Sequence, residues 1–186
     1  MNSAVTALPA CPIRPGAPGD EAALALLGQA TFLEAFAGVL RGSDILSHCT
    51  RAHSRSLYGD WLRDPRARVW VAETAHGAAM VGYLVLTAVD LPLPDIDPAD
   101  FEIKRVYLLH RFQGAGIGRR LMDAARAHAQ QHSGRRLLLG VYSQNSAAIS
   151  FYQALGYQTV GSRTFRVGDT DCSDLILALP LAARAG

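Results

Sequence analysis

The chain has 186 residues, of which 49% are hydrophobic and 18% are charged, and its formal net charge is +2 at pH 7. This composition is typical of one globular domain with a sizeable core, and it excludes an intrinsically disordered chain. No apolar run approaches the ~20 residues of a membrane-spanning helix, and so weak a positive charge gives no reason to expect a nucleic-acid partner. The three cysteines form no close pair, which indicates free thiols and a cytoplasmic protein.

The first twenty residues contain prolines at positions 9, 12, 15 and 18, and they have neither the basic start nor the apolar centre of a signal peptide. We expect residues 1–11 to form a loose arm. Because neither an internal repeat nor a linker interrupts the rest, we expect residues 1–186 to form one domain.

Two helices are expected next. Apolar spacing predicts the first after Asp20, a candidate N-cap, with Gly28 as the position where this helix could break. The second is expected over residues 43–62, and it should end before Pro65 because proline disfavours helical geometry in the residue that precedes it.

The remainder alternates strands with helices and ends in a hairpin. The predicted strands are residues 68–74, 79–89, 101–109, 135–143, 157–167 and 171–181. The predicted helices are residues 118–132 and 145–156. Residues 90–100, rich in Pro and Asp, are expected to form a loop. This order of elements indicates a mixed α/β fold.

Three glycines alternate in the segment HRFQGAGIGRRLM, at positions 114, 116 and 118, between a predicted strand and a predicted helix. Glycine inside a helix costs about 1 kcal/mol relative to alanine, so this segment must need the backbone itself. Such a turn gathers backbone N–H groups at the positive end of a helix dipole, which is a binding site for phosphate. A Walker loop is excluded because no Gly-Lys-Ser/Thr follows, and the dinucleotide fingerprint fails because Arg119 stands where it requires glycine.

The spacing that does fit is Q-x-x-G-x-G, formed by Gln113, Gly116 and Gly118. Together with the later segment NSAAISFYQALGY, it resembles the GNAT superfamily of acyl-CoA-dependent N-acyltransferases. The resemblance covers residues 69–157, and more loosely it extends to the branch that includes bacterial spermidine/spermine N-acetyltransferases. It implies an α/β (α+β) fold with a mixed, mainly antiparallel sheet of six or seven strands, helices on both faces, and a fourth and a fifth strand that splay apart.

The resemblance implies that backbone N–H groups of the glycine loop bind the pyrophosphate of acetyl-CoA. The residues concerned are Gln113, Gly114, Ala115, Gly116, Ile117 and Gly118. Arg119 and Arg120 follow as side-chain donors, and each could equally be an arginine on a solvated helix face.

Two further contacts to the cofactor follow from the resemblance. The backbone N–H of Leu108, near a bulge in the fourth strand, is expected to face the thioester carbonyl, where negative charge develops during attack. The alternative is a plain core strand. Asn145 is an N-cap by its position and a second contact to CoA by the resemblance.

Tyr152 is, by the same resemblance, the proton donor to the departing CoA thiolate. A phenol with a pKa around 10 can protonate a thiolate, because the corresponding thiol has a pKa around 8.5. Spacing alone would make Tyr152 a core aromatic with a polar tip.

The attacking amine must be neutral, so a base or a water path is expected near it. Glu102 is the first candidate, because it lies six residues before Leu108 and the two-residue period of a strand would put both on one face. Its alternative is an exposed strand carboxylate, and Glu34 is a weaker candidate base. Five acids between Asp90 and Glu102, with no base among them, would favour a cationic acceptor.

These observations predict an enzyme that moves an acetyl group from acetyl-CoA to a primary amine by direct attack in a ternary complex, without a metal. A small amine or polyamine is the expected acceptor. The alternatives are a protein or peptide acceptor, modified at its N-terminus or at lysine, and a CoA-binding sensor without turnover. Neither a membrane nor nucleic acid is expected as a partner, and the resemblance allows a homodimer.

Overall fold

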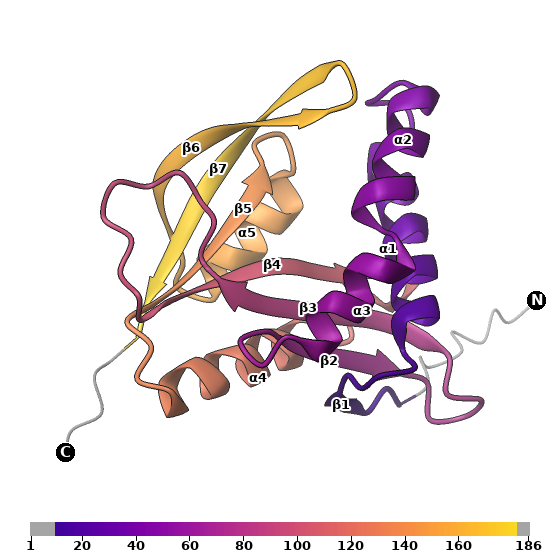
Figure 1. The fold of residues 1–186 in the computed structure, drawn as a ribbon, viewed down its shortest axis with the longest axis horizontal. Coiled ribbons are helices and arrows are strands. Elements are labelled where there is room, and N and C mark those ends of the chain that lie inside the picture. The colour runs from indigo at the N-terminus through magenta and orange to yellow at the C-terminus, as the bar shows by residue number, and fades with distance from the viewer. Residues whose placement is uncertain (1–9, 182–186) are drawn as a thin grey trace, which may run out of the picture.

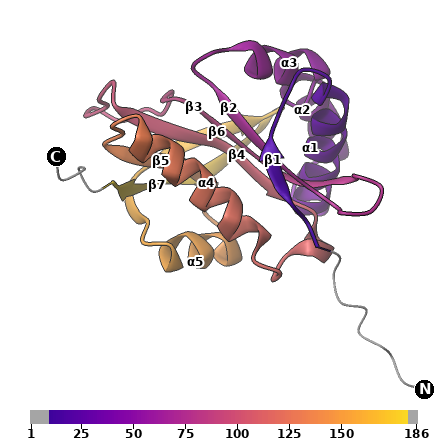
Figure 2. The ribbon, with the colours of Figure 1, turned by 90° about the horizontal axis from the view of Figure 1, so that it is seen from below.

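A computed structural model of the chain describes residues 10–181. Its centre is a seven-stranded sheet in the order β1-β2-β3-β4-β5-β7-β6, with helices on both faces (Figures 1 and 2). Neighbouring strands are antiparallel, except that β4 and β5 are parallel. The mixed, mainly antiparallel α/β fold expected from the sequence is confirmed. None of the described helices is long and apolar enough to cross a membrane.

The strands are β1 (Ile13–Pro15), β2 (Arg68–Glu73), β3 (Met80–Ala88), β4 (Asp100–Leu108), β5 (Arg136–Tyr142), β6 (Gln158–Val167) and β7 (Thr170–Pro180). The helices are α1 (Glu21–Phe36), α2 (Gly42–Ala52), α3 (Arg55–Arg63), α4 (Ile117–Gln131) and α5 (Ser146–Ala154), with a short 3₁₀ helix η1 (His110–Phe112) before α4.

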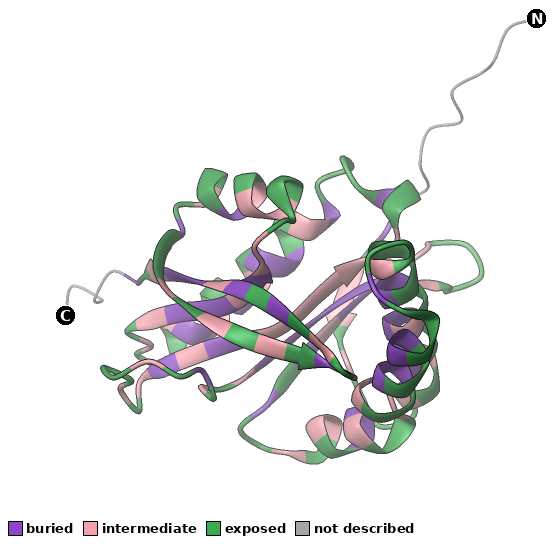
Figure 3. Cartoon of the chain, turned by 90° about the horizontal axis from the view of Figure 1, so that it is seen from above, coloured by how far each residue is buried: buried purple, intermediate pink, exposed green. Residues whose placement is uncertain are grey.

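The strands β2, β3, β4, β5 and β7 contribute alternate residues to apolar clusters on both faces of the sheet. The larger core lies under α4 and α5, where Leu84, Leu121 and Leu177 are fully buried. On the opposite face, α1 and α3 cover β2 and β3, with Leu24 and Val85 fully buried between them. The colours of Figure 3 follow this alternation along the hairpin of β6 and β7. The two faces therefore carry different helical layers.

The single helix expected over residues 43–62 is wrong, because the chain forms α2 and α3 with a break between them. Ser54 has extended backbone geometry, and its hydroxyl accepts a hydrogen bond from the Leu57 N–H at 3.2 Å, so it caps α3. His53, the residue before it, is fully buried. Gly28 does not break α1; a Cβ at this position would collide with the Tyr58 hydroxyl and His53 Nδ1.

The N-terminal segment also differs from expectation. Residues 1–9 of the expected arm lie outside the described residues. Cys11 is buried, and the Ala10 carbonyl accepts a hydrogen bond from the Ala75 N–H at 2.9 Å, so the arm prediction is wrong for residues 10 and 11. Asp20 precedes α1 without capping it, because its carboxylate instead binds Arg14 and the Ala17 N–H.

Arg105 on β4 joins the α2–α3 break to the sheet. Its guanidinium donates to the Tyr58 hydroxyl at 2.7 Å and to the Ala52 carbonyl at the end of α2, where the helix dipole favours a cation. It also donates to His53 Nδ1 at 3.2 Å. Because arginine can only donate, Nδ1 is the acceptor and the imidazole proton is on Nε2.

His48 and His53 are both held neutral by this environment. His48 stacks on Phe32 with ring centroids 4.2 Å apart. Burial, assisted by the nearby Arg105 charge, lowers the pKa of His48 to about 4 and that of His53 to about 2. Their neutral forms are therefore part of the folded state at pH 7.

The folded protein should consequently lose stability in mild acid. Between pH 6.5, the ordinary pKa of histidine, and pH 4, the unfolded chain protonates His48 while the folded chain does not. Stability contributed by neutral His48 is present above pH 6.5 and is lost as the pH falls towards 4, by about 3 kcal/mol. The variant His48→Phe keeps the stacked ring but cannot be protonated. Its loss of unfolding free energy between pH 6.5 and pH 4, measured by chemical denaturation, should be about 3 kcal/mol smaller than that of the wild type. Ser47→Ala, on the exposed side of α2, should keep the wild-type pH dependence.

Candidate active site

The parallel strands β4 and β5 pair along only a short part of their length. Their register joins Asp100–Glu102 of β4 to Arg136–Leu138 of β5, three residue pairs in all. Beyond them β4 continues to Leu108 along β3, and β5 continues to Tyr142 along β7. The two strands therefore splay apart, as the family resemblance implies, and Figure 1 shows β4 and β5 running in different directions.

The backbone of β4 directs hydrogen-bonding groups into this splay. The Leu109 N–H donates to the Val81 carbonyl of the neighbouring strand β3 at 3.0 Å, and peptide groups alternate sides along a strand. The N–H and carbonyl groups of Leu108 therefore point away from β3, towards β5. The Gln113 side chain donates to the Leu108 carbonyl at 3.4 Å, which ties the splay to the glycine loop.

The glycine loop lies at the open end of the splay, directly before α4. Gly114 has φ +78° and Gly116 has φ +74°, a left-handed geometry that side chains rarely adopt. Buried Phe112 and Ile117 anchor the loop on both sides, whereas Gly114, Ala115 and Gly116 are exposed. The loop thus presents the N-terminus of α4, with its positive dipole end, to solvent.

Gly118 and the two arginines that follow it have roles different from those of Gly114 and Gly116. Gly118 is helical, and a Cβ there would make ordinary contact with Phe151 at 3.5 Å. Arg120 donates to the Cys11 carbonyl at 2.8 Å, so its guanidinium holds the N-terminal segment. Arg119 is exposed on the first turn of α4. Of the two arginines, Arg119 is the one available to an anion at the loop.

Asn145 and Tyr152 come from α5, on the same face of the sheet as α4. The Asn145 side chain accepts a hydrogen bond from the Ala148 N–H at 3.1 Å, which makes it the N-cap of α5. Tyr152 is buried, and burial, with a smaller effect of Tyr107, raises its pKa above the ordinary phenol value. The Tyr152 hydroxyl therefore stays protonated over the physiological range.

Glu102 does not share a face with Leu108. The register with β3 shifts by one residue at Lys104, where β4 carries a bulge, so the two-residue alternation is reversed beyond it. The expected common face is wrong for this reason. Glu102 is buried at the closed end of the splay, and its carboxylate accepts from the Asp90 N–H at 2.7 Å and lies 3.2 Å from Lys104 Nζ.

The acids of residues 90–100 are engaged elsewhere. Asp100 is fully bound between Arg135 and Arg136, each 2.8 Å from its Oδ2, and these partners hold its pKa well below the ordinary value against the effect of burial. Asp95 pairs with Arg136 at 2.9 Å. The expectation that these acids attract a cationic acceptor therefore loses its basis for Asp95 and Asp100, which clamp the start of β5.

A chain of aromatic rings bridges the two arms of the splay on the face opposite α4 and α5. The successive rings are Tyr107, His53, Phe32, Phe36 and Tyr142, with neighbouring centroids 4.5 to 5.8 Å apart. We call this side the acceptor face.

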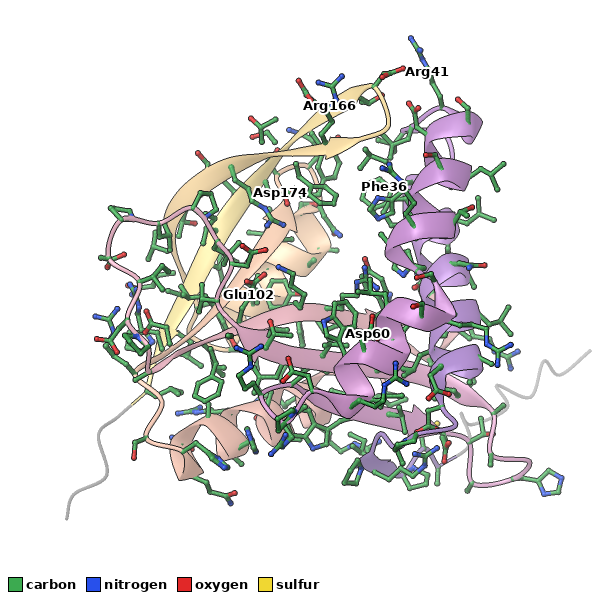
Figure 4. All side chains as sticks on the ribbon, viewed as in Figure 1. Phe36, Arg41, Asp60, Glu102, Arg166 and Asp174 are labelled. Atoms are coloured by element: carbon green, nitrogen blue, oxygen red, sulfur yellow. The ribbon has the colours of Figure 1, made fainter. Side chains whose placement is uncertain are left out.

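Sequence reasoning missed two polar residues of this face, Tyr107 on β4 and Asp174 on β7. Figure 4 labels Asp174 on the side of the β6–β7 hairpin and Phe36 on the side of α1. No motif marks either polar residue, because their placement depends on strand register and on the packing of α1 and α2.

The sequence profile of the Acetyltransferase (GNAT) family matches residues 40–157, which include β4, the glycine loop and α5. The chain belongs to the GNAT family. It is 30% identical over 162 residues to the uncharacterized N-acetyltransferase Rv2669 of Mycobacterium tuberculosis, covering 87% of this chain and 98% of that protein. It is also 31% identical over 118 residues to the peptidyl-lysine N-acetyltransferase YjaB of Salmonella typhimurium, covering 63% of this chain and 68% of YjaB.

The fold is also similar to that of a solved N-acetyltransferase. The PaiA N-acetyltransferase of Thermoplasma acidophilum, solved in complex with coenzyme A, superposes with a TM-score of 0.73 at 20% identity, covering 92% of this chain and 99% of PaiA. The family match, the related sequences and the fold together identify the chain as an acyl-CoA-dependent N-acetyltransferase.

Replacing Gly116 by valine should weaken acetyl-CoA binding at least tenfold, or about 1.4 kcal/mol. Valine is strained at φ +74°, and its side chain would occupy the space above the loop where a phosphate approaches. Calorimetric titration of the folded variant with acetyl-CoA measures the effect.

The matched control is Gly77→Val, in the turn between β2 and β3. Gly77 has φ +77° and, like Gly116, no heavy atom within 4 Å of an added Cβ, so valine brings comparable backbone strain far from the loop. This control should bind acetyl-CoA as the wild type does. Equal affinities of the two variants would contradict a phosphate-binding role for the loop.

Proposed function

We propose that this protein transfers the acetyl group of acetyl-CoA to a small primary amine by direct attack in a ternary complex. The observation that carries the proposal is the splay of β4 and β5, which has the glycine loop at its open end and chemically different groups on its two faces. A thioester lying in the splay is reached by the amine from the acceptor face and by Tyr152 from the face of α4 and α5.

Different residues of the chain then bind the cofactor, stabilise the oxyanion and donate the proton. The N–H groups of residues 113–118 bind pyrophosphate at the N-terminus of α4, with Arg119 as an additional donor. The Leu108 N–H stabilises the oxyanion that forms on the thioester carbonyl. As the carbon–sulfur bond breaks, the Tyr152 hydroxyl gives its proton to the CoA sulfur. Asn145 holds the start of α5 and so the position of Tyr152.

A small acceptor is supported by the closure of the acceptor face. Thr170, at the tip of the β6–β7 hairpin, donates to the Asp44 carboxylate of α2 at 3.1 Å, and Phe165 of β6 packs edge-on against His48 of α2. These contacts join the hairpin to α2, and Figure 1 shows the tip of the hairpin near the start of α2. An acceptor that must pass between fastened elements is a slender amine rather than a lysine on a broad protein surface.

The likeness to YjaB favours a second candidate, the acetylation of a lysine side chain in a protein or peptide. A panel containing n-butylamine, spermidine, free amino acids and lysine peptides, assayed for CoA release, separates the two. We expect kcat/KM for the preferred small amine to exceed that for any peptide at least tenfold. The reverse order would establish the second candidate, and release with none of them would leave a CoA-binding sensor.

The phenylalanine variant of Tyr152 should lower kcat by about 10² to 10⁴ while acetyl-CoA affinity stays close to wild type, because the hydroxyl acts only as the sulfur gains charge. Steady-state kinetics with the preferred amine and calorimetry with acetyl-CoA measure the two quantities.

Tyr157→Phe is the matched control. Tyr157 lies next to Tyr152, with ring centroids 5.9 Å apart, and within the described residues its buried hydroxyl has no hydrogen-bond partner. Its removal should leave kcat unchanged. Full kcat in Tyr152→Phe, with chemistry shown to be rate-limiting, would make Tyr152 a packing residue only.

A further inference from the structure

Asp174 is a buried carboxylate in the middle of the acceptor face, with only 5% of its surface exposed. Cys172 and Ile176, two residues before and after it on β7, share its face of the sheet. Cys172 belongs to the apolar cluster under α1 and α2, and Ile176 to the cluster under residues 89–93. Asp174 therefore lies between the two apolar clusters, as a polar group at the centre of this face.

The strands around Asp174 hold it in a defined orientation. Arg163 on β6 donates from Nε at 3.2 Å and from Nη2 at 3.1 Å, both to Oδ2. Gly140 on β5 makes room for this guanidinium, because a Cβ there would lie 2.8 Å from Arg163 Nη2. Among the described residues no donor binds Oδ1, so this oxygen can still accept a hydrogen bond.

The other buried acids of the described chain already have their partners. Asp44 accepts from Thr170, Asp100 is bound by two arginines, and Glu102 is bound by Lys104 and a backbone N–H. Among the residues that the structure describes, Asp44 likewise has a donor on Oδ2 alone, but it lies on α2 at the tip of the β6–β7 hairpin, whereas Asp174 keeps Oδ1 without a donor in the middle of the acceptor face.

The charge of Asp174 acts across the splay. Burial raises the pKa of Tyr107 on β4 to about 12, and the Asp174 carboxylate contributes to that increase. Burial also raises the pKa of Asp174 itself, although Arg163 opposes this. Tyr107 on β4 and Asp174 on β7, which pairs with β5, thus belong to the two arms of the splay.

The surroundings of Asp174 suit an alkylammonium ion. Tyr142 is its direct neighbour across the β5–β7 pair, whereas the Phe165 ring on β6 is already covered by the Arg163 guanidinium, whose central carbon lies 5.2 Å from the ring centroid. A carboxylate forms charge-assisted hydrogen bonds with an ammonium group, and aromatic rings attract the same cation through their faces.

We propose that Asp174 binds the ammonium group of the acceptor and takes the proton that must leave before the nitrogen can attack. The proposal rests on the amine acetyltransferase function above and deepens it. The acceptor is then a primary alkylamine that binds as its cation, and Asp174, rather than Glu102, is the catalytic base.

Asp174, Tyr152 and solvent account for every proton that moves in the reaction. The ammonium N–H proton passes to the Asp174 carboxylate and then to solvent, and the freed lone pair forms the carbon–nitrogen bond. The carbon–sulfur bond breaks, and its electron pair takes the Tyr152 proton to give the CoA thiol. The second proton on nitrogen is lost through solvent and restores Tyr152, leaving a neutral amide.

The pKa of Asp174 is raised by burial and lowered by Arg163 of β6. The other titratable groups on this face are Tyr142 of β5, Tyr107 of β4 and Cys172 of β7; His48 and Cys49 of α2 lie beyond them in the adjoining cluster. Because Arg163 lowers the pKa of Asp174, removal of that arginine should raise it further.

Asp174→Asn should therefore lower kcat/KM about 100-fold at pH 7 with acetyl-CoA affinity unchanged. The deficit should shrink to within about fivefold near pH 10, because about half of an alkylamine of pKa about 10 is then neutral in solution, against about one part in 1,000 at pH 7, and the neutral form needs no base. In Arg163→Gln the acidic limb of the kcat/KM profile should move to higher pH. Asp171→Asn, an exposed acid on the same strand, should follow the wild-type profile.

A structural role for Asp174 would give a different result. A loss in Asp174→Asn that is the same at every pH, or no loss at all, would overturn the proposal. Glu102→Gln shows whether the base is elsewhere: if this variant, and not Asp174→Asn, is rescued at high pH, Glu102 is the base.

A binding measurement tests the proposal without turnover. Calorimetric titration of the CoA-bound protein with n-butylammonium at pH 7 should show at least tenfold weaker binding to Asp174→Asn than to wild type. Equal binding to both proteins would overturn the ammonium site even if acetyl transfer is established. An intact ammonium site in a protein that acetylates none of the amine panel would instead contradict the proposed function.

Discussion

The three residue pairs that join β4 to β5 are the constraint on which the rest of the site depends. Backbone N–H and carbonyl groups inside a sheet normally bind the next strand, and leaving them without partners costs free energy. Where β4 and β5 separate, those groups face a space that a chain of amide groups, such as the pantetheine arm of CoA, can occupy. The splay thus exchanges strand pairing for the ability to bind a ligand along its backbone.

Two sets of contacts maintain this geometry. At the closed end, Arg135 and Arg136 hold Asp100, so the strands remain joined there. At the open end, each arm belongs to a different part of the fold: β4 pairs with β3 under α1 and α3, whereas β5 pairs with β7 over α5. The aromatic rings of α1 and α2 then span the arms on one face only. The two faces of the splay therefore differ, since α4 and α5 cover one and these aromatic rings span the other.

The buried polar contacts around Arg105 show how the acceptor side is kept rigid. Arg105 binds the end of α2, and the break that follows lets His53 enter the core. The helix end supplies the partial negative charge that offsets the guanidinium, so no carboxylate is needed there. On the opposite arm, Asp174 is held by Arg163.

Local features of the site were readable from the sequence alone, because they depend on neighbouring residues. Gly114 and Gly116 supply left-handed backbone geometry, Asn145 caps the helix that begins after it, and most strands follow the two-residue period. Features set by distant parts of the chain were not readable. The bulge at Lys104 reverses the face of Glu102, and the burial of His53 divides an expected helix in two. Asp174 acquires its surroundings only when β7 pairs with β5 and β6, since register between strands and packing against α1 and α2 are decided by tertiary structure.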